Sequence, residues 1–149
     1  MDKHSGQIYE LIWATRRLFQ QLRVTSDALL EGTGINASQR AVLEFLHQHQ
    51  PQTVSNIARE KTVSRQHIQT VVNELLPLKL IQALENPAHK RSPLISMTEK
   101  GKNLFRQINQ QEIKVLDEMA NEFREKNITT STRTLNALND YLQSGEWKK

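Results

Sequence analysis

Residues 53–101 restrict the fold more than any other part of the chain. Two short helical patterns lie close together in it, the first beginning after Thr53 and the second at Ser64. A strand over 81–85 follows, then a turn with Lys90 and Arg91, then a return strand that includes Leu94, Ile95 and Met97. This order predicts a helix-turn-helix followed by a β-hairpin, in a chain that is otherwise mostly α.

The second helical pattern carries side chains that can read DNA bases. Ser64 is a good N-cap, and Ile68, Val71, Val72, Leu75 and Leu76 recur at the spacing of a buried helix face. The opposite face begins with Arg65, Gln66, His67, Gln69 and Thr70. Arg pairs with guanine and Gln with adenine, and the first residues of a recognition helix contact base edges. We therefore predict DNA contacts at Ser64 and at these five residues.

Polar residues on an outer helix face are most often only solvated surface. The charge distribution along the chain helps to decide between that interpretation and contact with DNA. Residues 53–102 hold eight Lys and Arg against four acids, whereas residues 1–52 hold five of each and residues 103–149 seven of each. The whole net charge of +4 therefore lies in the predicted module. A localised basic surface is what contact with DNA phosphates requires.

The chain resembles the MarR family of bacterial winged-helix regulators over nearly its full length. The resemblance rests on VSRQHIQTVVNELL, on the Leu80-Ile81 pair and on ENPAHKRSPLISMTEKG. It implies a single domain over 1–149, mostly α with a small β wing. It also implies a winged helix-turn-helix at 36–101 and dimerisation helices at 8–30 and 102–145.

The resemblance also assigns roles in the wing. It implies that Arg91 reaches into the minor groove, and Lys90 is expected to contact phosphate. Two positions depart from the family's pattern: His89 stands where Asp is common, and Lys79 stands where Gly is common. The first departure leaves the wing's internal ion pair open, and the second suggests a different helix exit.

The rest of the chain reads as helices with clear breaks. After a loose start at 1–7, a long helix runs to about Leu30 and breaks at 31–34. Asn36 and Gln39 form a capping-box pattern at the start of the second helix. Pro77 predicts a kink or an end of the recognition helix. Thr98 can cap the helix that follows the return strand. That helix is expected to end at Asn127, with a last helix from Thr130 or Ser131. Pro93 predicts that the return strand lies at a sheet edge.

Composition narrows the function classes. The chain has 149 residues, 37% of them hydrophobic, which suits one domain but favours a core shared between two copies. It has no cysteine, which excludes disulfides, thiolate metal sites and cysteine-based oxidation sensing. No run is apolar enough to span a membrane and no signal-peptide pattern is present, so a cytoplasmic protein is expected. Enzyme motifs are absent, so no catalytic residues are predicted.

Histidines and a group of aromatic and basic residues are the candidates for small-ligand sites. His47, His49, His67 and His89 lack metal-ligand spacing and read as surface histidines, so no metal or other cofactor is predicted. The resemblance allows an effector pocket between the dimer helices and the DNA module. Its candidate residues are Trp13, Arg16, Arg17 and His47. The competing interpretation is that Trp13 serves in packing and that Arg16 and Arg17 are solvated.

These observations support two hypotheses. The first is a homodimeric transcriptional regulator, a repressor that binds double-stranded DNA at a palindromic operator and is released by a small molecule. The second is a winged-helix protein-interaction module without sequence-specific DNA binding. An interaction module should expose apolar residues on the wing and reading helix, where this sequence places Arg65, Lys90 and Arg91.

Overall fold

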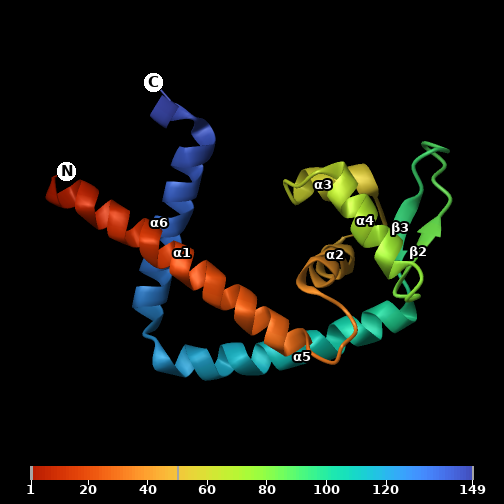
Figure 1. Cartoon of the computed structure of the whole chain (residues 1–149), viewed down its shortest axis with the longest axis horizontal. Helices are drawn as coiled ribbons and strands as arrows, with labels where there is room; N and C mark the ends of the chain where they lie inside the picture. The colour runs from red at the N-terminus through yellow and green to blue at the C-terminus, as the bar shows by residue number, and fades with distance from the viewer. Residues whose placement is uncertain (1, 50, 149) are drawn as a thin grey trace. The chain divides into compact units, whose positions relative to one another are not determined.

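The structure is a computed structural model that describes residues 2–49 and 51–148. The chain divides into two compact units between Asn109 and Gln110. The elements, in chain order, are α1 (Lys3–Leu30), α2 (Ala37–Gln48), β1 (Gln52–Thr53), α3 (Val54–Glu60), α4 (Arg65–Leu75), β2 (Ile81–Leu84), β3 (Leu94–Met97), α5 (Glu99–Glu122), α6 (Glu125–Ser144) and the short 3-10 helix η1 (Glu146–Lys148) (Figure 1). This confirms a mostly α chain with a small β wing.

Helix α1 begins earlier than the sequence predicts. It starts at Lys3, because the Asp2 carboxylate accepts from the Ser5 backbone N–H at 2.8 Å and caps the first turn. The predicted loose start is therefore wrong for residues 2–7, while Met1 lies outside the described residues. The predicted break after α1 is confirmed, and Gly32 and Gly34 supply it with φ values of 78° and 79°.

The predicted capping box at the start of α2 is confirmed. The Gln39 N–H donates to Asn36 Oδ1 at 2.9 Å, and the Asn36 N–H donates to Gln39 Oε1 at 3.0 Å. Gln39 is buried, and its amide donates to Glu74 Oε2 of α4 at 2.8 Å. The N-terminus of α2 is therefore tied directly to α4.

The core of the first unit lies where α2, α3, α4, the sheet and the start of α5 meet. Its most completely buried members include Leu43, Ile57, Ile68, Leu75 and Ile95. These residues come from four different elements, so the helix-turn-helix and the sheet share one core. Burial of the inner face of α4 fixes which of its side chains face solvent.

The sheet has three antiparallel strands in the order β1-β3-β2. Leu94 of β3 pairs with Thr53 of β1 and with Leu84 of β2, so β3 is the central strand. The prediction that Pro93 marks an edge strand is therefore wrong. Pro93 stands just before the strand begins, where no ladder hydrogen bond requires its missing N–H. Strand β1 was not predicted, because two residues carry no alternation pattern.

Helix α4 ends at Leu75, two residues before Pro77, as the sequence predicts. Lys79 then adopts a φ of 58°, a left-handed conformation that glycine favours. Lys79 donates its N–H to the Leu76 carbonyl at 2.9 Å, and Leu80 donates to the Leu75 carbonyl at 3.4 Å. The suggestion of a different helix exit is wrong, because Lys79 adopts the backbone conformation that a glycine would supply.

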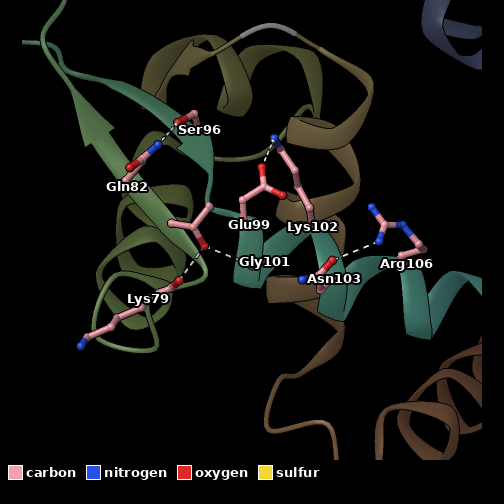
Figure 2. Close-up of polar contacts among 9 residues, drawn as sticks. Lys79, Gln82, Ser96, Glu99, Gly101, Lys102, Asn103 and Arg106 are labelled. Atoms are coloured by element: carbon pink, nitrogen blue, oxygen red, sulfur yellow. Dashed lines mark hydrogen bonds and ion pairs between the residues drawn. The ribbon is translucent and has the colours of Figure 1, made fainter.

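The start of α5 is tied to this exit, and the predicted cap is confirmed. Thr98 Oγ1 accepts from the Gly101 N–H at 3.1 Å and donates to the Lys79 carbonyl at 2.7 Å (Figure 2). The Thr98 N–H donates to the Leu80 carbonyl at 3.1 Å. One threonine therefore joins the segment after α4 to the first turn of α5.

The second unit contains the end of α5, α6 and η1. Helix α5 ends at Glu122 and α6 starts at Glu125, so the predicted end at Asn127 and the predicted start at Thr130 or Ser131 are wrong. The first turn of α6 has no side-chain cap, so the sequence carries no start signal there. Within the described ranges, no helix has both the length and the hydropathy of a membrane span.

Candidate nucleic-acid interface

The turn between α3 and α4 sets the position of the reading helix. The Val63 N–H donates to the Ala58 carbonyl at 3.0 Å, and the Thr62 N–H donates to the Arg59 carbonyl at 3.2 Å. Thr62 has a φ of 55°, which is rare for a β-branched residue. The turn therefore closes around a strained residue that the sequence pattern did not reveal.

Helix α4 begins as predicted at the Ser64 cap. The Ser64 hydroxyl oxygen accepts from the His67 backbone N–H at 3.1 Å. Its inner residues Ile68, Val71, Val72 and Leu75 are buried. The predicted base-reading residues Arg65, Gln66, His67, Gln69 and Thr70 are all exposed on the outer face.

Two of these outer side chains already make hydrogen bonds within α4. Gln69 donates one N–H to Asn73 Oδ1 at 3.0 Å, which leaves its other N–H and its carbonyl oxygen for adenine. Thr70 donates its hydroxyl to the Gln66 carbonyl at 3.0 Å, which leaves its methyl and hydroxyl oxygen. Asn73 was not among the predicted site residues, although its spacing from Gln69 is typical of paired amides on one helix face.

A groove with a volume of about 110 Å³ lies between the reading helix and the wing. Its lining brings together Arg65 and Gln69 of α4 with Arg91 of the wing. Thr53 and Ser55, at the start of α3, also line it and were not predicted as site residues. The groove therefore unites predicted residues from two separate segments and adds two neighbouring hydroxyl groups.

The wing is the β2–β3 hairpin, whose tip projects away from α2, α3 and α4 (Figure 1). Lys90 and Arg91 lie near its tip and are exposed. Within the part of the chain that the structure describes, neither makes an ion pair, nor does Arg65. Their charges are therefore available to an anionic partner.

No family model matches the chain. An uncharacterized protein of Mycobacterium tuberculosis is 37% identical over 68 residues, which are 46% of this chain and 48% of the relative. The matched segment therefore spans about half the length of that relative.

Solved structures match much more of the chain. A MarR family transcription regulator aligns with a TM-score of 0.88 at 24% identity, over 95% of this chain and 93% of its own. Staphylococcus aureus MarR in complex with salicylate and kanamycin aligns with a TM-score of 0.85 at 17% identity, over 95% of this chain and 96% of its own. A mutant MarR from E. coli in complex with operator DNA aligns with a TM-score of 0.79 at 19% identity, over 93% of this chain and 99% of its own. The chain has the MarR fold.

The ion pairs of this MarR fold leave the reading surface unneutralised. Ion pairs among the described residues include Arg40–Glu44, Arg59–Glu60 and Lys102–Glu99. The hydrogen bond from Lys102 to Glu99, at 2.7 Å, holds the pKa of the Glu99 carboxyl below its ordinary value of 4.5. These pairs include none of the predicted DNA-contacting residues.

The candidate effector residues lie on two helices. Trp13, on the exposed side of α1, packs edge-on against Tyr9, and the Arg16 guanidinium lies 5.6 Å from its ring centroid. Arg17 is exposed on the same helix. His47, on α2, lies against Phe105 with ring centroids 4.9 Å apart. The effector site stays a prediction, since these contacts alone do not define a shared pocket.

His47 also lines a pocket of about 360 Å³ with His49, Gln82, Ser96 and Lys102. The His49 ring stacks on Phe45 and its Nδ1 lies 2.8 Å from the Phe45 carbonyl oxygen, which can only accept, so Nδ1 carries the proton. Among residues 2–49 and 51–148, no three His, Asp or Glu side chains are placed to share a metal ion.

Proposed function

We propose that this protein is a sequence-specific, DNA-binding transcriptional regulator. The observation that carries the proposal is the groove where Arg65, Gln69 and Arg91 converge, on a surface whose cations have no internal partner among the described residues. The MarR-like structures support it, because one of them is a MarR protein with operator DNA.

In this proposal the two segments have different tasks. Helix α4 lies in a major groove, where Arg65 pairs with guanine and Gln69 with adenine, while Gln66, His67 and Thr70 contact neighbouring bases or sugars. The Ser64 hydroxyl serves mainly as the helix cap. The wing follows the backbone into the adjacent minor groove, with Arg91 inserted and Lys90 on phosphate.

We further propose that the protein acts as a homodimer. Large exposed apolar side chains lie on α1, on the end of α5, in the bend after it and on α6: Ile8, Tyr9, Trp13, Leu18, Phe19, Leu22, Ile113, Leu116, Met119, Phe123, Ile128, Tyr141 and Leu142. Helix α6 has no buried residue in a single copy. Apolar surface of this extent is typical of an interface, and a two-fold dimer would select a palindromic operator.

Regulation by a small molecule belongs to the same proposal. Staphylococcus aureus MarR in complex with salicylate and kanamycin shares this fold. We propose a repressor released by an effector that favours a dimer with a different spacing of the two reading helices. Trp13, Arg16, Arg17 and His47 are the residues to test first for effector binding.

A selection from random duplexes tests the central proposal. We expect a palindromic winner that binds at least about a thousandfold more tightly than a scrambled duplex, measured at two salt concentrations. Equal binding of every duplex with a steep salt dependence would reduce the basic surface to an electrostatic one. The protein-interaction hypothesis would then be preferred.

Single substitutions test the roles of individual residues. Arg65→Ala should cost about 1–3 kcal/mol on the selected duplex and relax specificity at one base pair, whereas Lys90→Ala should weaken all duplexes alike. Arg106→Ala is the matched control, because Arg106 is an exposed arginine on α5 outside the groove. Equal losses on selected and scrambled DNA for Arg65→Ala would contradict its base-reading role.

A further inference from the structure

The loop at the tip of the wing has one buried residue. Asn86 is only 9% exposed, whereas Glu85 and each residue from Pro87 to Arg91 are exposed. Asparagine is seldom buried unless its amide is hydrogen-bonded. The side chain of Asn86 therefore has a structural task inside a loop that otherwise faces solvent.

The Asn86 amide uses both of its ends within the loop. Its Nδ2 donates to the Ser92 carbonyl oxygen at 2.7 Å, and its Oδ1 accepts from the Ala88 backbone N–H at 3.1 Å. The backbone adds two turns, from the His89 N–H to the Asn86 carbonyl at 3.2 Å and from the Ser92 N–H to the His89 carbonyl at 3.1 Å. The amide thus bridges the two ends of the segment that carries Lys90 and Arg91.

This bridge lies in the loop where the family commonly has an ion pair, which the departure at His89 leaves open for this chain. His89 stands at the position where an acid is common in the family, and Arg91 makes no ion pair among the described residues. A neutral amide bonded to backbone groups fixes the loop without using a charged side chain. The full charge of Arg91 therefore stays available to DNA.

We propose that Asn86 is the positioning residue of the wing, which holds the loop in the conformation that presents Arg91 to the minor groove and Lys90 to the phosphate backbone. The inference rests on the proposed function, because it assigns the wing a role in DNA contact. A loop ordered before binding does not lose that conformational freedom when the complex forms. The amide bridge should also keep its geometry when salt concentration changes, unlike an exposed ion pair.

Three variants separate the bridge from its surroundings. Asn86→Ala removes both side-chain hydrogen bonds. Asn86→Asp keeps the acceptor for the Ala88 N–H but turns a carboxylate oxygen toward the Ser92 carbonyl. Gln82→Ala is the matched control, because its amide donates to Ser96 Oγ at 3.3 Å across the same hairpin but outside the loop (Figure 2).

The first measurement needs no DNA. Amide hydrogen exchange of the full-length protein should be faster at Ala88, His89 and Ser92 in Asn86→Ala, and faster at His89 and Ser92 in Asn86→Asp. In Gln82→Ala these amides should exchange at the wild-type rate. Unchanged exchange in Asn86→Ala would overturn the proposal, because the side chain would then not be what orders the loop.

The second measurement is a double-mutant cycle on the duplex chosen by selection. Asn86→Ala should weaken binding about tenfold, since Lys90 and Arg91 must then be ordered during association. Arg91→Ala should cost clearly less affinity in the Asn86→Ala background than in wild type. A purely structural defect would lower the melting temperature but leave the cost of Arg91→Ala unchanged, which would overturn the positioning role. If wild-type protein bound no duplex, the proposed function would fail, while the exchange data would still report on the loop.

Discussion

Gly101 occupies a position where an added methyl group has no room. A Cβ built there would lie 2.0 Å from the Leu80 carbonyl oxygen and 2.9 Å from its carbonyl carbon. Both atoms belong to the backbone, so no side chain can rotate away to relieve the contact. Alanine could be accommodated only if α5 and the segment after α4 moved apart by about 1.5 Å, since non-bonded atoms prefer separations of about 3.5 Å.

That movement would break contacts which join the two segments. The Thr98 N–H donates to the Leu80 carbonyl at 3.1 Å, and Thr98 Oγ1 donates to the Lys79 carbonyl at 2.7 Å. Losing both would cost about 2 kcal/mol, and overpacking adds about 1–3 kcal/mol. Replacing a helical glycine by alanine returns about 1 kcal/mol. We therefore expect Gly101→Ala to lower the free energy of unfolding by about 2–4 kcal/mol.

Urea denaturation followed by circular dichroism, at one fixed protein concentration, measures this change. Gly6→Ala is the matched control, because Gly6 also lies in a helix and its added Cβ would meet nothing within 4 Å. That variant should be as stable as wild type or more stable by up to about 1 kcal/mol. If Gly101→Ala matched or exceeded the stability of Gly6→Ala, the steric argument would be refuted.

Three further substitutions test local features by the same denaturation assay or by titration. Thr62→Gly should raise the free energy of unfolding by up to about 1 kcal/mol, because it relieves a φ of 55°; a loss of stability would contradict the strain. Asn36→Ala should lower it by about 0.5–2 kcal/mol, because it removes the Asn36 Oδ1 that accepts from the Gln39 backbone N–H; an unchanged midpoint would deny the cap a role. Lys102→Gln should raise the pKa of Glu99 in a carboxyl NMR titration, because Lys102 is the main cause of its lowering. In wild type the pair stabilises the folded protein above pH 4.5, the ordinary pKa of the carboxyl, and this stabilisation is lost as the pH falls through the lowered pKa.

The helix starts inside the reading module were predictable because each depends on one local hydrogen bond. Asn36, Thr53, Ser64 and Thr98 all accept from a backbone N–H three residues later. Such a bond needs only the right side chain next to an apolar helical pattern. The start of α6 shows the limit of this reasoning, because Arg124 precedes it without a side-chain cap.

The left-handed residues were not predictable from residue type. Thr62 and Lys79 both adopt positive φ without being glycine. At each position hydrogen bonds outweigh the preference of the residue type: the Val63 N–H closes the end of α3 on the Ala58 carbonyl after the first, and Thr98 donates to the Lys79 carbonyl at the second. A sequence rule that expects glycine at left-handed positions therefore misses these two turns, although the winged-helix fold is formed.

The candidate site likewise has one part that local sequence pattern predicts and one part that depends on tertiary structure. Periodicity placed Arg65 and Gln69 on the solvent face of α4, because the buried face is defined by local apolar spacing. That Arg91 joins them in one groove depends on the pairing of β2 with β3, where Ala83 is opposite Ile95 and both line the groove beside Arg91. A shift of one residue in this pairing would reverse the faces of the strand. The wing's contribution to DNA binding should therefore depend on hairpin register and on the Asn86 bridge as much as on the charge of Arg91.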